Sequence, residues 1–221
     1  MIESHYPKFN KIIDEFERDS LTFSSNKEII TYYPQIFLLS VASTFEKDIK
    51  EKCINVINAP SILLSTLPIL NNIVLNNANN CSDAIYKKFR TRNLVFDATD
   101  FYKVFGGASF KNAVATAFEI EKQKQILEHS KIVKSLTPLI GKTDACDYEF
   151  TKNTEICELL SALDFNAAET SFLKLKEKRN HVAHDFISGI SDTFLDLRTL
   201  YYSAVLYVVA VKDELSKLSI I

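Results

Sequence analysis

The fold is decided by the segment QIFLLSVASTFEKDIKEKCINVIN, which covers residues 35–58. Its strongly apolar positions recur at steps of three and four residues, the spacing that places side chains on one face of an α-helix. Proline flanks it, with Pro34 near the predicted start and Pro60 just past the predicted end. The segment therefore predicts a long helix with one buried face. The positions on that face are Leu38, Ala42, Phe45, Ile49, Cys53 and Val56.

Similar apolar spacing continues along the chain, whereas no strand-like alternation lasts beyond a few residues. The chain has only 4 glycines and 5 prolines in 221 residues, and a β-rich fold needs more turn residues than that. We therefore expect an all-α helical bundle, built as a single domain over residues 1–221, with long helices near both ends and additional helices in the middle. The further predicted helices cover residues 111–134, 148–163, 166–184 and 194–215, and we expect the last two of them to pack with the helix over 35–58. The apolar positions of the last helix are Phe194, Leu197, Tyr201, Ala204, Val205, Val208 and Leu215.

Breaks between these helices are indicated by turn residues. A glycine pair at 106–107 precedes the helix over 111–134, and Pro138 with Gly141 predicts a connector over 137–147. Asn166, followed three residues later by Glu169, is typical of a helix N-cap. An apolar stretch over 61–75 and an Asn-rich loop over 76–80 complete the middle of the chain.

Composition restricts the class of protein. The 26 basic and 28 acidic residues nearly balance, so net charge alone does not make the chain a polyanion binder. The 4 cysteines show no CxxC spacing and are too sparse for a disulfide framework or a zinc knuckle. Residues 1–9 lack the apolar core of a signal peptide, and the longest apolar run, 201–211, is about half the length of a membrane span. We therefore expect a soluble, cytoplasmic protein that needs no membrane and no cofactor.

One charged residue stands where an apolar residue is expected. The apolar stripe of the helix over 166–184 comprises Ala168, Phe172 and Leu175, and then Val182 and Phe186. At 100° per residue, Arg179 lies about 20° from Ala168, in the middle of this stripe. A buried guanidinium without a partner costs several kcal/mol, so Arg179 needs a carboxylate or a polar cleft, which a second subunit or a ligand could provide. Glu46, on the shoulder of the helix over 35–58, is a candidate partner. A structural ion pair is therefore one open interpretation of Arg179.

The residues around Arg179 favour a second interpretation. Two imidazoles and an amide follow it within six positions, RNHVAH, in a chain with only 4 histidines. Asn180 and His184 are four apart and share a helix face. Arg179 and His184 are about 140° apart on an ideal helix, so they converge only by flanking a shared cleft or by loosening of the last turn.

At these residues the sequence resembles the HEPN superfamily, whose ribonuclease members carry an arginine, usually followed by a polar residue, and a histidine four to six residues later. The matching positions are Arg179, Asn180 and His184, which follow an amphipathic run and precede a final helix. The early helix, with Phe45 and Glu46, is similar to that of bacterial HEPN proteins. The two segments and the last helix cover roughly half of the chain, and the region over 57–147 has no counterpart in the resemblance.

The resemblance implies a metal-independent endoribonuclease that acts as a homodimer and leaves a 2′,3′-cyclic phosphate and a 5′-OH. His184 would move the protons, Arg179 would bind the phosphate, and Asn180 would orient the histidine or hold a phosphate oxygen. HEPN proteins often belong to toxin–antitoxin or antiphage systems, which suggests an RNA-cleaving toxin or defence effector with an antitoxin or another regulatory partner. The RNA could be a tRNA or an mRNA.

Candidate supporting and RNA-binding residues lie close to the motif. His181 could line the cleft, and Glu46 could support Arg179. Lys174 and Lys178 are four apart, so both can flank the cleft and meet RNA, although a solvated face is the default explanation for such lysines. A second basic cluster lies over residues 87–92, and Tyr201, Tyr202 and Tyr207 could stack on bases or belong to the core.

Two other functions remain open. His181, His184 and Asp185 could begin a metal site, because histidines three apart can share a helix face. A cysteine–histidine hydrolase is less consistent with the sequence, because no cysteine has a recognisable nucleophile context. The main alternative is a non-catalytic HEPN-like interaction module that binds a partner protein or a nucleotide.

Overall fold

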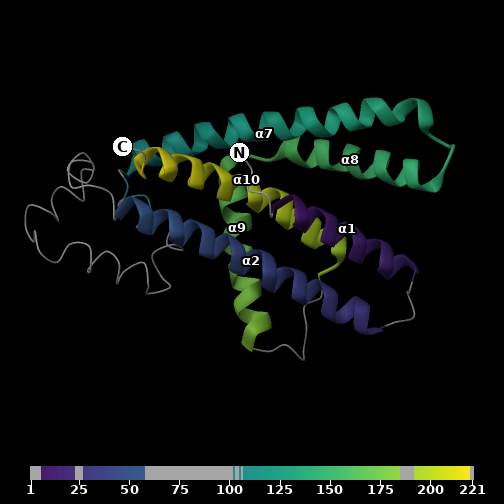
Figure 1. Cartoon of the computed structure of the whole chain (residues 1–221), viewed down its shortest axis with the longest axis horizontal. Helices are drawn as coiled ribbons and strands as arrows, with labels where there is room; N and C mark the ends of the chain where they lie inside the picture. The colour runs from purple at the N-terminus through teal and green to yellow at the C-terminus, as the bar shows by residue number, and fades with distance from the viewer. Residues whose placement is uncertain are drawn as a thin grey trace, which may run out of the picture. The chain divides into compact units, whose positions relative to one another are not determined.

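The computed structural model describes residues 6–22, 27–57, 102, 105, 107–184 and 192–219. Within these residues every regular element is helical, so the expected all-α fold is confirmed (Figure 1). That the bundle is of the HEPN type stays a prediction. The apolar stretch over 61–75, the loop over 76–80 and the basic cluster over 87–92 lie outside the described residues. The helices are α1 (Tyr6–Thr22), α2 (Lys27–Ile57), α7 (Ala108–Leu136), the short 3-10 helix η1 (Thr137–Leu139), α8 (Asp144–Ala162), α9 (Phe165–His184) and α10 (Phe194–Ser219).

The predicted helices are present, and most of them are longer than predicted. The six apolar positions predicted for the early helix are all buried in α2. This helix nevertheless begins at Lys27, so Pro34 lies inside it and not at its start. Proline costs a helix one N–H donor, and α2 continues through Pro34 because burial of its apolar face outweighs that loss.

Helix α1 was not predicted from the sequence. Its apolar positions Phe9, Ile12, Ile13 and Phe16 have helical spacing, but its mean hydropathy is low because acidic and basic residues stand between them. Ile13 is buried, as is Tyr6 at the start of the helix. The spacing, rather than the hydropathy, is the signal that could have found α1.

The described chain forms two compact units. Unit 1 comprises residues 1–42 and 118–207, and unit 2 comprises residues 43–117 and 208–221. Helices α2, α7 and α10 each contribute one segment to each unit. The expectation of a single domain therefore stays a prediction, and each unit is described by itself.

Two of the aromatic clusters in the described core of unit 1 join helices that are far apart in the sequence. In the first, the rings of Phe9 in α1, Phe37 in α2 and Tyr201 in α10 contact one another edge to face, with centroids 6.0–6.3 Å apart. The Tyr201 hydroxyl donates to the Tyr6 carbonyl oxygen at 2.9 Å. These contacts hold α1, α2 and α10 together. They confirm part of the predicted packing, that of α2 against the last helix.

The second aromatic cluster joins three helices of unit 1. The Phe165 ring of α9 lies 5.8 Å from Phe118 in α7 and 5.9 Å from Tyr207 in α10, centroid to centroid. Phe172, two turns further along α9, lies 5.4 Å from the same Tyr207 ring. Aromatic pairs at such distances add to the stabilisation that burial of their surface provides. The cluster fixes α9 against α10.

Helices α7 and α8 form a hairpin, seen side by side in Figure 1. The predicted connector over 137–147 is shorter than expected, because η1 and the first turn of α8 occupy most of it. Gly141 has a φ of +76°, a conformation that residues with a Cβ rarely adopt. The Gly141 N–H donates to Asp147 Oδ1 at 2.7 Å, and the Thr143 hydroxyl caps α8 by accepting from the Cys146 N–H.

The apolar core of unit 2 contains a buried ion pair. Phe110 at the start of α7 contacts the rings of Tyr102 and Phe105. Lys212 Nζ in α10 lies 3.1 Å from Asp48 Oδ2 in α2, and both side chains are less than a tenth exposed. Breaking such a pair is costly because the remaining charge stays buried.

Helix α10 is strongly apolar along most of its length. Its segment Phe194–Leu218 is long and apolar enough to cross a bilayer by length and composition. Most of that segment is buried inside the structure, which is the pattern of a core helix.

Candidate functional site

The predicted motif lies in the last two turns of α9. The helix begins after Asp164, whose Oδ1 accepts from the Ala167 N–H at 2.7 Å. Asp164 is therefore the capping residue, and the prediction of Asn166 as N-cap was wrong. Asn166 lies inside the first turn, because the helix begins one residue earlier at Phe165.

The apolar stripe of α9 has the predicted register. Ala168, Phe172, Leu175 and Val182 are all buried. Arg179 lies between Leu175 and Val182 on this stripe and is half-buried. The structure thus gives Arg179 its predicted position on the stripe, although the residue is half-buried and not fully buried. The remaining predicted stripe position, Phe186, lies outside the described residues.

The motif residues differ in exposure. Asn180 is half-buried, whereas His181 and His184 are exposed. The helix is regular as far as His184, so the last turn has not loosened. Arg179 and His184 therefore remain about 140° apart around the helix axis, and a single α9 does not direct both side chains to one point.

The two lysines beside the motif, Lys174 and Lys178, differ in their exposure to solvent. Lys174 is exposed. Lys178 donates to both carboxylate oxygens of Asp192, each at 2.8 Å, just before α10 begins. The pair is partly exposed, so an RNA phosphate would compete with Asp192 for this ammonium group.

Glu46, the predicted support for Arg179, belongs to unit 2, whereas Arg179 belongs to unit 1. Glu46 is buried and lies 2.5 Å from Lys50 Nζ, one turn later in α2. Its pairing with Arg179 stays a prediction.

The three tyrosines of α10 that could have stacked on bases are buried. Tyr201, Tyr202 and Tyr207 are each at most 5% exposed. Burial raises the pKa of Tyr201 and of Tyr202 well above the usual range of a phenol. Their rings belong to the core of unit 1 and are not presented to a nucleic acid.

Among the described residues, no group of three or more His, Cys, Asp and Glu side chains is placed to hold a metal ion. Asp185, the carboxylate of the alternative metal site, lies outside the described residues.

A network of charged side chains that was not predicted from the sequence joins α1 to α8 and α10. Arg198 of α10 is 7% exposed, and its Nη1 lies 3.1 Å from Glu17 Oε2. Its Nη2 lies 3.6 Å from Glu155 in α8. The Tyr148 hydroxyl also donates to Glu17, at 2.7 Å. Burial and this bond to Glu17 raise the pKa of Tyr148 above its usual range, so the phenol remains a donor.

A second part of the network lies one turn away. Lys152 Nζ is 2.8 Å from Asp14 Oδ2 in α1 and 2.8 Å from Glu149 Oε1 in α8. The Lys152 side chain is only 9% exposed. The other oxygen of Asp14, Oδ1, is buried and accepts no hydrogen bond from any residue that the structure describes.

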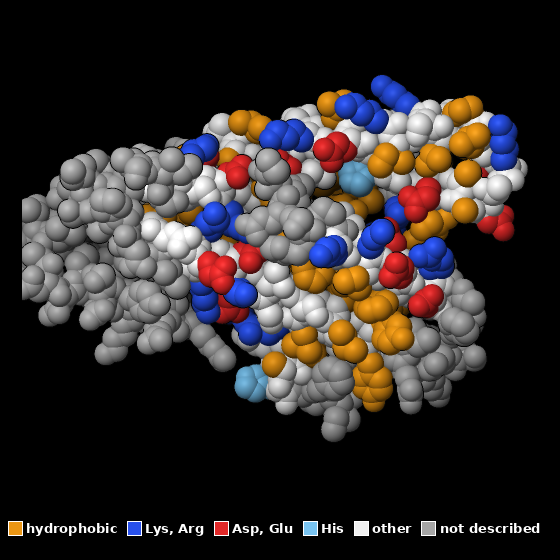
Figure 2. Space-filling view, viewed as in Figure 1, with side chains coloured by type: hydrophobic (Ala, Val, Ile, Leu, Met, Phe, Trp, Pro, Cys, Tyr) orange, Lys and Arg blue, Asp and Glu red, His pale blue; other side chains and the backbone are white. Residues whose placement is uncertain are grey.

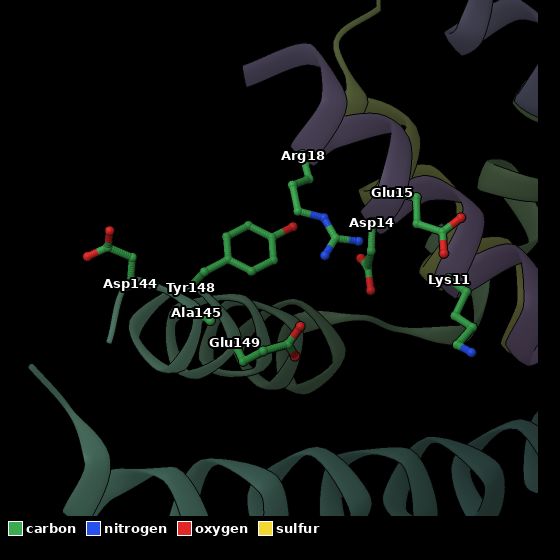
Figure 3. A pocket seen from close by; sticks show the side chains of 8 residues that line it. All are labelled: Lys11, Asp14, Glu15, Arg18, Asp144, Ala145, Tyr148 and Glu149. Carbon is green, nitrogen blue, oxygen red and sulfur yellow. The ribbon is translucent and has the colours of Figure 1, made fainter. Parts of the chain in front are cut away.

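A pocket of about 510 Å³ opens beside this network, between α1 and α8. Figure 3 shows Arg18 of α1 and Tyr148 of α8 directed toward one another. None of the motif residues of α9 lines it. Residues of α1 and α8 are about 130 positions apart in the chain, so their meeting was not readable from local spacing.

Comparison with protein-family models, with curated proteins and with solved structures found no match.

Proposed function

We propose that this chain is a metal-independent endoribonuclease of the HEPN type that acts as a homodimer. The observation that supports the proposal is the placement of Arg179, Asn180 and His184 in the last two turns of α9, with His184 exposed and Asn180 on the same helix face. The resemblance of this segment to HEPN ribonucleases supplies the reaction.

Each group has a distinct role in the proposed chemistry. An imidazole removes the proton from a ribose 2′-OH, the 2′-oxygen forms a bond to phosphorus, and the bond from phosphorus to the 5′-oxygen breaks. A second imidazole gives a proton to the leaving 5′-oxygen. Arg179 neutralises charge on the phosphate in both steps, and Asn180 orients His184 or holds a phosphate oxygen. The products are a 2′,3′-cyclic phosphate and a 5′-OH.

The proposed dimer follows from the number and direction of these groups. One chain supplies a single His184, whereas the reaction uses a base and an acid. On the regular helix α9 the Arg179 and His184 side chains diverge by about 140°. A two-fold axis beside the end of α9 would provide two copies of each group and allow an arginine and a histidine to face one cleft from different subunits. Light scattering at micromolar concentration tests this arrangement, and an active monomer would contradict it.

Cleavage of labelled RNA in the presence of EDTA tests the reaction itself. We expect His184→Ala to lower the cleavage rate by a factor of about 10² or more, because it removes the acid–base group. His181→Ala is the matched control: it is also an exposed imidazole of α9, and it should have a smaller effect. Equal rates for wild type and a folded His184→Ala protein would refute the proposal, as would products with a 3′-OH.

An RNA-cleaving toxin or defence effector, restrained by an antitoxin or another regulatory protein, is the biological role that we propose for this activity. The target RNA, either a tRNA or an mRNA, would be identified by sequencing the 5′-OH ends that accumulate when the protein is expressed.

The second candidate is a non-catalytic interaction module of HEPN type. It is favoured by the engagement of Lys178 with Asp192, which neutralises one of the two lysines proposed to guide RNA. Figure 2 also shows acidic and basic side chains interspersed on the face in view, among the described residues, and not separated by sign. Under this alternative, the folded wild-type protein would bind a partner and leave RNA intact.

A further inference from the structure

The ammonium group of Lys178 in α9 is held by carboxylates at the start of α10. Lys178 Nζ donates to Asp192 Oδ1 and Oδ2, each at 2.8 Å, and Asp192 directly precedes Thr193, whose hydroxyl caps α10. The exposed Asp196 of the first turn is also close, because the charge of Lys178, after the hydrogen bonds from Thr193, lowers the pKa of its carboxyl. The ammonium group therefore has acidic neighbours on the side of α10.

The position of Lys178 on α9 is next to the side chains that the proposed function directs to RNA. At 100° per residue, Lys174 lies about 40° from Lys178 around the helix axis. His181 and His184 lie about 60° and 120° from it in the same direction. These three residues are all exposed. Lys178 thus borders the exposed side of α9, although its charge is engaged by Asp192.

The ion pair is able to open because it is only partly buried. The Lys178 side chain is 35% exposed and that of Asp192 is 16% exposed. Ion pairs in contact with solvent contribute little net stability, since water and salt screen them. A phosphate oxygen accepts from an ammonium group as a carboxylate oxygen does. An RNA on this side of α9 would therefore exchange one anionic partner of Lys178 for another.

We propose that Asp192 is an autoinhibitory residue, which holds Lys178 and so lowers the affinity of α9 for RNA. The inference rests on the proposed function, because it requires RNA to lie along the exposed side of α9. It gives the two lysines different roles. Lys174 contacts a phosphate directly, whereas Lys178 does so only after its ion pair with Asp192 opens.

Fluorescence anisotropy of the full chain with a labelled 2′-O-methyl oligoribonucleotide tests the inference. This probe lacks the attacking 2′-OH, so binding is measured without cleavage. We expect Asp192→Asn to lower the Kd about threefold or more, because Lys178 is released. The matched control is Glu177→Gln, which changes net charge equally at an exposed position beside Lys178 and should change the Kd less than about twofold. Equal strengthening by the two variants, or none in a folded Asp192→Asn protein, would overturn the inference.

A double variant tests whether Asp192 acts through Lys178. Adding Lys178→Met to Asp192→Asn should cancel the gain in affinity. It should also reduce the slope of log K against log salt concentration by about 0.7, the value for one phosphate contact with a single strand. A merely structural ion pair would not alter this slope. A gain that persists without Lys178 would overturn the inference.

If Asp192→Asn does not fold by circular dichroism, single lysine variants provide the test. Lys174→Met should then weaken RNA binding more than Lys178→Met, because Lys178 is engaged before RNA arrives. Equal effects of the two variants, or a larger effect of Lys178→Met, would overturn the inference.

RNA cleavage in EDTA, measured on the same preparations, separates this inference from the proposed function. Cleavage by wild type without an effect of Asp192→Asn on binding would overturn the inference alone. The expected effect on binding without cleavage by any of the proteins would refute the ribonuclease and support the autoinhibitory contact. No binding by any of the proteins, Asp192→Asn included, would overturn both.

Discussion

Charged side chains meet other helices in two regions of the molecule: the interface of α1 with α8 and α10, and the last two turns of α9. The two regions differ in how deeply these charges are buried and in the carboxylates that lie beside them. At the first, Arg198 and Lys152 are nearly buried, and each lies beside two carboxylates. At the second, Arg179 is half-buried and His184 is exposed at the end of the helix. Compensated buried charges hold helices in one arrangement, whereas an exposed imidazole is able to exchange protons with a substrate.

The largest effect that we predict is the loss of stability in Glu17→Ala. This change removes the closest carboxylate from Arg198 and the acceptor of the Tyr148 hydroxyl. A buried charge that loses its partner costs about 3–5 kcal/mol. Urea denaturation followed by circular dichroism measures the change in the free energy of unfolding.

Glu155→Gln is the control for this prediction. Glu155 also faces Arg198, but at 3.6 Å and with a side chain that is 51% exposed, so its loss should cost less than about 1 kcal/mol. Similar values for the two variants would show that water compensates Arg198, and the contrast between the two regions would then disappear.

A change of Arg179 should act on activity and leave stability intact. We expect Arg179→Ala to lower RNA cleavage by a factor of about 10² or more, because the guanidinium stabilises charge on the phosphate. Its melting temperature should change little, because the residue is half-buried and a partly exposed charge contributes little to stability. RNA cleavage and thermal unfolding are measured on the same preparation. If Arg179→Ala unfolds while a folded His184→Ala protein remains fully active, Arg179 is a structural ion-pair residue and the interaction module is favoured.

Thr193→Ala should have a moderate effect, because the polar groups at the start of α10 are exposed. The Thr193 hydroxyl accepts from the Asp196 N–H at 3.2 Å, and the Thr193 N–H donates to Asp196 Oδ2 at 2.9 Å. Loss of such a cap costs about 1 kcal/mol. Thr199→Ala, the same substitution at an exposed position inside α10, is the control and should cost nothing measurable in urea denaturation. Equal costs would indicate that Thr193 does not act as a cap.

The smallest effect is a pH dependence at the same cap. Hydrogen bonds from the Thr193 side chain and backbone lower the pKa of Asp196 below its ordinary value of 3.8. Because the folded-state pKa is the lower one, the stabilisation is present above pH 3.8 and is lost as pH falls through the folded pKa. The stability difference between wild type and Asp196→Asn, measured by thermal unfolding, should therefore be larger at pH 7 than at pH 3. A difference that does not change with pH would contradict this assignment.

Much of the fold could be predicted from the sequence because apolar spacing is a local property. The buried face of α2, the stripe of α9 and the core positions of α10 all have the predicted register. The errors arose where a local rule competed with packing. Pro34 lies inside α2 because burial of that helix outweighs one lost hydrogen bond.

The candidate site was likewise predictable only where its residues lie close together in the sequence. The presence of Arg179, Asn180 and His184 near the end of one helix was readable, because residues within two turns have fixed relative directions. The pairing of Glu46 with Arg179 was predicted between segments that are distant in the sequence, and it stays a prediction. The engagement of Lys178 by Asp192 was not predicted either, since it joins residues on opposite sides of a helix connection.

The sequence by itself determined an all-α protein, the register of its buried helix faces and an arginine set into an apolar stripe. All of these follow from the side-chain periodicity of single helices. Only the tertiary structure decided that α1 meets α8 and α10 through charged groups, and that a pocket opens between α1 and α8. The physical reason is that a buried charge is stabilised by an oppositely charged side chain, and that side chain can come from a distant part of the sequence. The partners of Asp14 and Glu17 lie more than 130 residues away, where no helical period connects them.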